Sequence, residues 1–306
     1  MNSPTVSHRP LALLGLSLLT ALSAQATLLV YEGFHGYDLG AMEGQTPNGN
    51  TTGLDQSVGY YDGATTSRAD KFSVQSAGLS LGSLQTSGGS LQFITGTGVI
   101  GADIDIGPTA HTGTLWGSYL VNLTSKGSGG SDGAVLRIGS KPSESTAAHF
   151  NSWADSRSNS ANIAVGYASG TANGNGSLTN GTTYIIISKF TRVGQTVDTT
   201  NTGVATQWAL DAGQFADFLD AGGDEAALNS VSITGVSTST VSSITSNAFS
   251  SSMAFGLVTV NDTGTFDEIR FGTDLADVTP IPEPGSLAAL AGLCSIFAFA
   301  TRRRRA

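Results

Sequence analysis

Short runs of alternating apolar residues, separated by turns rich in glycine, serine and asparagine, most constrain the fold of this chain. In LWGSYLVNL the residues Tyr119, Val121 and Leu123 share one face, and in VATQWALD the residues Trp208 and Leu210 do. Side chains two positions apart lie on the same side of a strand, so each run predicts a strand with one apolar face. We therefore expect an all-β fold, in which two antiparallel sheets bury their apolar faces against each other as a sandwich.

Three stretches depart from simple alternation. TTYIIISKF, residues 182–190, is apolar almost throughout, which predicts a central strand buried on both faces. AGQFADFLDAGG places Phe215, Phe218 and Leu219 on one side and Gly222 at its end, which predicts one short helix. The Ser/Thr-rich residues 236–252 indicate a surface loop or an irregular edge strand.

The charge of the central part limits its partners. Residues 27–281 carry 9 basic and 22 acidic side chains, a net charge of −13, whereas the whole chain has −9. Such a body does not attract phosphate backbones, so we expect no nucleic-acid partner. The only cysteine, Cys294, lies near the C-terminus, which excludes disulfides and thiolate metal sites from the body.

The N-terminus has the features of an export signal. A short basic segment precedes an apolar run from Leu11 to Leu22, and Ala24 and Ala26 supply a small-x-small cleavage pattern. We predict a signal peptide over residues 1–26 that is removed to leave Thr27 as the first residue. An uncleaved anchor or a buried helix is the alternative.

The C-terminus combines a rigid triplet, an apolar run and a basic cluster. Residues 285–300 carry no charge and precede the arginines Arg302, Arg303, Arg304 and Arg305, which predicts a single transmembrane helix over 285–301 with its end on the cytoplasmic side. Pro282 and Pro284 hold Glu283 in an extended segment, the conformation in which a protease binds its substrate. A permanent membrane anchor is the plain alternative.

These features of residues 281–306 resemble the PEP-CTERM sorting signal of bacterial exported proteins. The resemblance implies that a membrane-embedded transpeptidase, exosortase, recognises the triplet, removes the tail and passes the body to the envelope or an extracellular matrix. It also implies a transient stay in the inner membrane, with the export machinery as a second partner.

Two stretches near the ends of the body resemble the first and last strands of concanavalin A-like, laminin-G-like jelly rolls. They are LLVYEGFHGYDLG, which begins at Leu28, and FDEIRFGTDLADVTP, which ends at Pro280. The resemblance implies that residues 27–280 form one jelly-roll domain whose terminal strands lie close together.

A search for catalytic residues finds no set that carries a reaction. A retaining glycosidase needs two acids about 5 Å apart. The nearest pairs are Asp103 with Asp105, on one face, and Asp267 with Glu268, which strand alternation places on opposite faces. The histidines are scattered, and no nucleophile elbow has a plausible triad context. We therefore expect a protein that is not an enzyme and assign no catalytic residue.

Binding residues are indicated only weakly. Tyr60 and Tyr61 in a Gly/Asp-rich turn, and Trp153 in polar company, are candidates for stacking against sugar rings. Calcium is the one cofactor considered, and its candidate ligands are Asp220, Asp224 and Glu225; acids solvated on loops are the alternative.

The sequence thus predicts an exported, non-catalytic cell-surface or extracellular-matrix protein. A lectin-like carbohydrate-binding protein, with extracellular polysaccharide as its partner, is the alternative. A glycoside hydrolase is a remote third.

Overall fold

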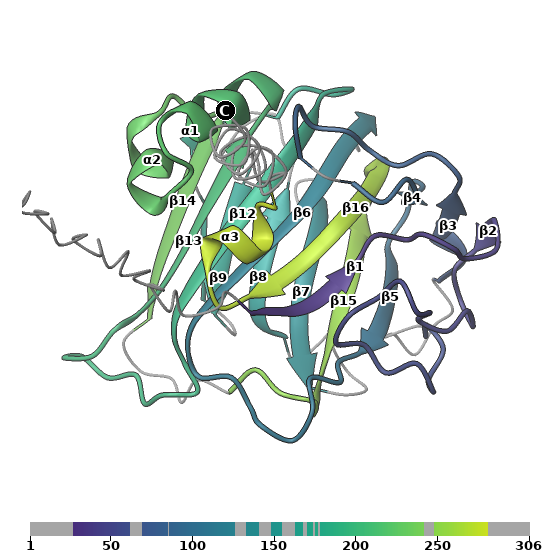
Figure 1. Ribbon diagram of the computed structural model, residues 1–306, viewed down its shortest axis with the longest axis horizontal. Coiled ribbons are helices and arrows are strands. Elements are labelled where there is room, and N and C mark those ends of the chain that lie inside the picture. Colours follow the sequence, from purple (N-terminus) through teal and green to yellow (C-terminus); the bar gives the residue numbers. More distant parts are fainter. Residues whose placement is uncertain are drawn as a thin grey trace, which may run out of the picture.

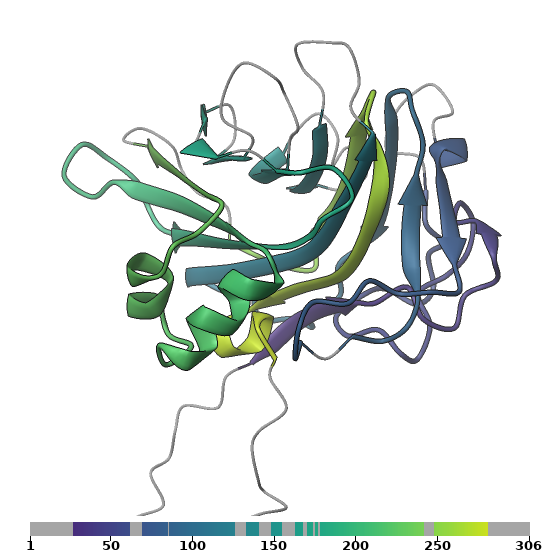
Figure 2. The same cartoon turned by 90° about the horizontal axis from the view of Figure 1, so that it is seen from above.

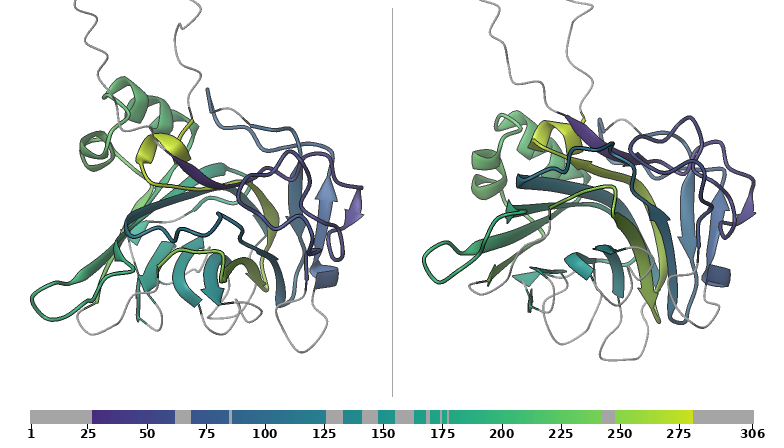
Figure 3. Two further views of the ribbon diagram at one scale, coloured as in Figure 1. Left: turned by 60° about the horizontal axis from the view of Figure 1, so that its bottom comes forward. Right: turned by 90° about the horizontal axis from the view of Figure 1, so that it is seen from below.

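The computed structural model describes residues 27–280 apart from 62–68, 85, 126–132, 141–147, 155–162, 168–169, 174, 177 and 242–247. Two antiparallel sheets dominate these residues. The larger sheet is curved, and the smaller one lies against its concave side (Figures 2 and 3). The predicted all-β, two-sheet antiparallel sandwich is confirmed.

The large sheet has the strand order β11-β14-β13-β12-β6-β16-β4-β3-β2, and β1 also pairs with β16. Its strands are β1 (Leu28–Glu32), β2 (Gly40–Ala41), β3 (Phe72–Gln75), β4 (Ser90–Phe93), β6 (Gly113–Ser125), β11 (Asn175–Gly176), β12 (Thr183–Val193), β13 (Gly203–Leu210), β14 (Gly235–Val241) and β16 (Thr263–Gly272). The last strand of the chain, β16, therefore lies well inside the sheet (Figure 1).

The small sheet has the order β10-β9-β8-β7-β15-β5. Its strands are β5 (Gly98–Asp103), β7 (Gly133–Ser140), β8 (Ala148–Ala154), β9 (Ile163–Tyr167), β10 (Gly170–Asn173) and β15 (Met253–Val260). Short helical elements complete the fold: a 3-10 turn η1 (Ala69–Lys71), α1 (Ala212–Asp220), α2 (Glu225–Ser230) and α3 (Leu275–Val278).

Strand β12 shows how the sequence divides the core in two. Ile186 and Phe190 point into the main core between the sheets, whereas Ile185 and Ile187 belong to a second apolar cluster. That second cluster lies on the other face of the large sheet and includes buried residues of all three helices. Figure 1 shows α1, α2 and α3 in front of this face. The predicted central strand buried on both faces is confirmed.

Helix α1 forms where the sequence predicts it. Asp211 caps its N-terminus with a reciprocal capping box to Gln214, and Phe215 and Phe218 are buried. Helices α2 and α3 have six and four residues and were not predicted, since neither spans two turns of apolar periodicity. In the Ser/Thr-rich stretch, residues 235–241 form β14, which pairs with β13 on one side and with the two-residue edge strand β11 on the other.

The two ends of the sandwich meet, as the jelly-roll resemblance implies. Strands β1 and β16 pair antiparallel from Leu28 with Gly272 to Glu32 with Ile269. The backbone N–H of Thr27 donates to Thr273 Oγ1 at 3.2 Å, and the N–H of Thr273 donates to the carbonyl of Thr27 at 3.2 Å. Among the described residues, no helix is long and apolar enough to cross a membrane. The predicted signal peptide and the predicted transmembrane helix over 285–301 lie outside the described residues.

Candidate functional site: a buried carboxylate network

The strongest concentration of charge in the interior lies where β16 changes its partner. Residues Gly264–Phe266 pair with β4, and Ile269–Gly272 pair with β1 on the same edge. Asp267 and Glu268 occupy the gap, where the register to β6 also shifts. Glu268 has φ of 52°, a left-handed conformation uncommon for any residue except glycine. This bulge interrupts the regular strand alternation from which the opposite-face prediction for the two acids was made.

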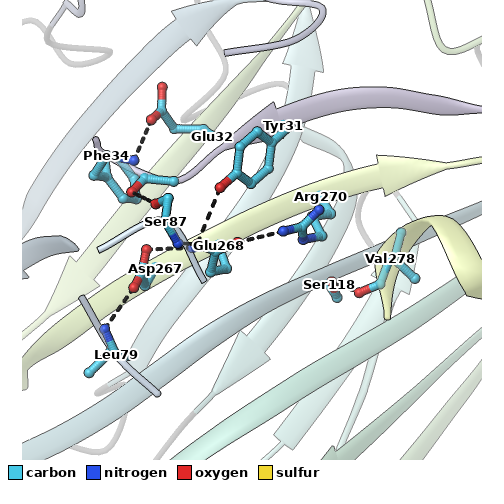
Figure 4. Close-up of polar contacts among 11 residues, drawn as sticks. Tyr31, Glu32, Phe34, Leu79, Ser87, Ser118, Asp267, Glu268, Arg270 and Val278 are labelled. Carbon is cyan, nitrogen blue, oxygen red and sulfur yellow. Dashed lines mark hydrogen bonds and ion pairs between the residues drawn. The ribbon is translucent and has the colours of Figure 1, made fainter. Parts of the chain in front are cut away.

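The two carboxylates satisfy backbone donors that no strand partner reaches. Asp267 Oδ2 accepts from the N–H of Leu79 at 2.7 Å, and its Oδ1 accepts from the N–H of Glu268 at 2.8 Å. Glu268 Oε1 accepts from the N–H of Ser87 and from the hydroxyl of Tyr31 (Figure 4). Since backbone donors withdrawn from water need acceptors, these side chains supply them and hold Leu79 and Ser87 against the sheet.

A third buried acid, Glu32 at the end of β1, interacts with Asp267 and Glu268 through its charge. Its Oε1 accepts from the N–H of Phe34 at 2.6 Å, and its Oε2 accepts from the hydroxyls of Tyr37, at 2.6 Å, and Tyr60. We did not single out Glu32 from the sequence, although a signal was present. Val30 and Glu32 are two positions apart on a strand, which places an acid on the apolar face.

Burial controls the protonation of these acids. The side chains of Glu32, Asp267 and Glu268 are 0 %, 0 % and 1 % exposed. Loss of water raises the pKa of Glu32 to about 7. Burial, together with the neighbouring charge of Glu268, raises the pKa of Asp267 to about 8. The nearby cation is Arg270, whose Nη2 lies 2.6 Å from Glu268 Oε2 and whose guanidinium lies 4.4 Å from the ring centre of Tyr31.

The hydrogen bonds of the network join segments that are distant in the sequence. The hydrogen bonds of the three carboxylates go to backbone N–H groups, tyrosine hydroxyls and one arginine, and none of the three side chains faces solvent. The arrangement therefore stabilises the junction of β1 and β16 with the backbone at Leu79 and Ser87.

The predicted sugar-stacking residues have different surroundings. Tyr60 is 1 % exposed, and its ring packs edge-on against Tyr37 and Phe255. The prediction that Tyr60 offers an exposed ring is wrong, because its hydroxyl serves the buried Glu32. Tyr61 is half-buried and donates to Asp103 Oδ1 at 2.8 Å. Trp153 lies in β8, and its side chain is outside the described residues.

The three calcium candidates lie in different local environments. Asp224 caps α2, with Oδ1 accepting from the N–H of Ala227 at 2.8 Å, and Glu225 pairs with Lys189 at 2.6 Å. Asp220 is the last, exposed residue of α1. Within the part of the chain that the structure describes, no group of three or more potential metal ligands comes together.

A surface hollow that the sequence did not predict lies beside the network. It has a volume of about 590 Å³ and is lined by Gly36, Tyr37, Asp38, Glu43, Gly44, Gln45, Thr46 and Asn48. Gln45 braces this loop by accepting from the N–H of Asp38 and donating to its carbonyl. Tyr37 links the two features, since it is one of the residues that line the hollow and its hydroxyl donates to Glu32 Oε2.

Comparison with known families identifies the tail. The PEP-CTERM protein-sorting motif matches residues 280–305, which confirms the resemblance drawn from Pro282–Pro284 and the arginine cluster. The motif marks an exported, cell-surface protein that an exosortase processes at the membrane. The residues of this signal lie outside the described part of the structure. No curated protein matches the chain.

Several solved structures resemble the body distantly. Lectin II from Ulex europaeus is 12 % identical with a TM-score of 0.36, and the match covers 66 % of this chain and 92 % of the lectin. The exoplasmic/lumenal domain of VIP36, in a Ca²⁺/Man2-bound form, is 8 % identical with a TM-score of 0.37, over 79 % of this chain and 90 % of that domain. A Shewanella oneidensis protein of unknown function is 12 % identical with a TM-score of 0.31, over 74 % and 88 %.

Proposed function

We propose that this chain is a non-catalytic component of the cell envelope or extracellular matrix, released from its membrane tail by an exosortase at Pro282–Pro284. The single observation that carries the proposal is the match of residues 280–305 to the PEP-CTERM protein-sorting motif. The order of triplet, uncharged run and arginine cluster supports it, because the arginines hold the C-terminus inside while the triplet stays outside.

The interior of the body also supports a structural role. Glu32, Asp267 and Glu268 are the strongest concentration of buried acids in the described residues, and their hydrogen bonds join strands and loops. The body contains no cysteine, so burial and hydrogen bonding must stabilise it outside the cell. Turnover of any polysaccharide by the purified body would contradict the non-catalytic part of the proposal.

The test is expression with and without an exosortase. With the enzyme, the native protein should lose the arginine-bearing tail, which intact mass measures directly. Replacing Pro282, Glu283 and Pro284 together with alanine should leave the protein full length in the membrane fraction. Ser286→Ala, just beyond the triplet, is the matched control and should be processed normally. Equal processing of the native and triple-alanine proteins would show that the triplet is not recognised.

Glycan binding is the second candidate function, and the hollow beside Tyr37 favours it. The hollow is lined by one tyrosine and several polar residues, and sites for small ligands combine aromatic residues with a few hydrogen-bonding groups. Thr46 is exposed in this lining, so Thr46→Trp should obstruct part of the hollow. Thr200→Trp, on an exposed loop between β12 and β13, is the control.

A glycan array with residues 27–280, with and without calcium, tests this second function. Saturable binding that Thr46→Trp abolishes and Thr200→Trp preserves would support a sugar site in the hollow. Binding that both variants retain would place the site elsewhere, and no binding under either condition would leave the structural role alone.

A further inference from the structure

The folded body ends almost at the sorting triplet. Thr279 is 2 % exposed and donates from its hydroxyl to the carbonyl of Leu275 at 2.9 Å. The sorting motif begins at residue 280, and Pro282 is three residues beyond Thr279. Three residues span at most about 11 Å, even when fully extended. The covalent chain therefore limits the distance of Pro282 from Thr279 to less than the radius of gyration of the body, which is about 18 Å for this length.

This spacing conflicts with what a peptidase needs. A protease holds its substrate as an extended segment whose backbone is free to pair on both sides of the triplet. Residues before the triplet do not meet this condition while Thr279 and Val278, both buried, are packed into the fold. A body tethered this closely to the triplet would also obstruct the approach of a membrane-embedded enzyme.

Helix α3 is the element that keeps these residues packed, and few contacts hold it. Leu275 and Val278 are its buried side chains, and Ser118 donates from its hydroxyl to the carbonyl of Val278 at 2.6 Å (Figure 4). Asp277 Oδ2 accepts from the N–H groups of Thr273 and Asp274, each at 2.9 Å.

Release of α3 would lengthen the accessible segment without breaking the sheet. The paired part of β16 ends at Gly272, so all of α3 lies beyond the last strand pairing. From Thr273 to Pro282 there are nine residue steps, which reach about 30 Å when extended. Short terminal elements of this kind open locally more readily than the core.

We propose that α3 is a latch that limits tail removal: the exosortase accepts the Pro282–Pro284 triplet only after α3 has left the large sheet. This inference rests on the proposed function. The stability of α3, and not that of the whole body, then sets the rate of processing.

The test measures the rate of tail loss in a pulse-chase experiment with an exosortase. Val278→Ala removes buried contacts of the latch and should speed processing roughly tenfold, because it favours the open form. Val165→Ala, an equally buried valine in β9, is the matched control and should process at the native rate. A flexible Gly-Ser insertion of about eight residues between Thr279 and Pro280 should speed processing and remove the difference between Val278→Ala and the native latch.

The outcomes separate the latch from the proposed function. Native rates for Val278→Ala and for the insertion, with the triple-alanine variant still uncut, would overturn the latch and leave the sorting role intact. Equal acceleration by Val165→Ala would also overturn it, since global stability would then set the rate. Slower processing of the insertion variant would overturn it in favour of a required contact between body and enzyme. If the triple-alanine variant is cut like the native protein, or if no variant loses its tail, both proposals fail.

Discussion

Acidic side chains accept backbone hydrogen bonds in two regions of this molecule, under opposite conditions. At the junction of β1 and β16, Asp267 accepts from the N–H of Leu79 at 2.7 Å while 0 % exposed. At the helices on the outer face, Asp224 accepts from the N–H of Ala227 at 2.8 Å while exposed. The hydrogen bonds are nearly alike in length, but only the second carboxylate keeps part of its hydration.

The difference shows that location, more than the hydrogen bond itself, decides what such an acid contributes. An exposed cap stabilises a helix modestly and can be replaced by water when it is lost. A buried acid leaves several unsatisfied donors behind when it is removed, and its own charge is costly to bury. The buried region should therefore respond strongly to mutation and to pH, and the helix region weakly.

The largest expected effect is that of Glu268→Ala. This change removes the acceptor for Ser87 N–H and breaks the ion pair of Glu268 with Arg270, which is 9 % exposed. Breaking a buried ion pair on one side costs about 3–5 kcal/mol. Urea unfolding should show a loss of that size in the free energy of unfolding. A loss below about 1 kcal/mol would mean that a buried acid contributes no more to the free energy of unfolding than an exposed helix cap does.

The next effect is a fall in stability as pH rises. The pKa values of Glu32 and Asp267 are raised to about 7 and about 8, so the folded state binds more protons than the unfolded chain in this range. The stabilising contribution is complete below about pH 4 and is lost as pH rises towards 8, by roughly a few kcal/mol in total. The urea midpoint should therefore be lower at pH 9 than at pH 5.

Glu32→Gln tests the origin of this pH dependence. Glutamine keeps an oxygen for the N–H of Phe34 and cannot ionise, so the slope of stability against pH should become flatter. Glu43→Gln, at an exposed position, is the control and should keep the native slope. If Glu32→Gln keeps the native slope of stability against pH, the pH dependence comes from other titratable groups.

A smaller effect is expected for Asp224→Ala at the start of α2. Loss of the N-cap bond to Ala227 should lower the free energy of unfolding by about 1 kcal/mol. Asp220→Ala, at the exposed end of α1, should change it less. If Asp224→Ala lowers the free energy of unfolding as much as Glu268→Ala does, the exposure of an acid does not determine how much it stabilises the fold.

The smallest effect belongs to the pair of Lys189 and Glu225. Their side chains are 21 % and 44 % exposed, so solvent screens the ion pair. A double-mutant cycle with alanine at both positions should give a coupling energy below about 1 kcal/mol, reduced further by salt. A larger, salt-independent coupling would show that this helix region resembles the buried network.

The periodic parts of the fold could be predicted because their signal is local. The all-apolar run of residues 182–190 predicts a strand buried on both faces, and Ile185 and Ile186 indeed enter different apolar clusters. Helix α1 follows from Phe215, Phe218 and its capping residues for the same reason. Each of these patterns is complete within about ten residues of sequence.

The candidate site could not be predicted in the same way, because its partners are distant in the sequence. Tyr60 stands in a turn-like stretch that suggests exposure, but the acid that holds its hydroxyl is 28 residues away. The bulge at Glu268 requires a positive φ, for which a glutamate gives no sequence signal. Its cause is the change of strand partner from β4 to β1, which is a property of the assembled sheet.

The position of β16 between β6 and β4 has a consequence for how the protein folds during export. Strand β16 comes last in the chain, yet without it the large sheet is two separate pieces, β11-β14-β13-β12-β6 and β4-β3-β2, each with an open edge. The contact of Thr27 with Thr273 joins residues 246 positions apart. Contacts between residues so distant in the sequence raise the contact order, and proteins of high contact order fold slowly. If the chain crosses the membrane unfolded with its N-terminus first, the large sheet cannot be completed until almost all of the body has crossed, and the open strand edges would need protection from aggregation for that time.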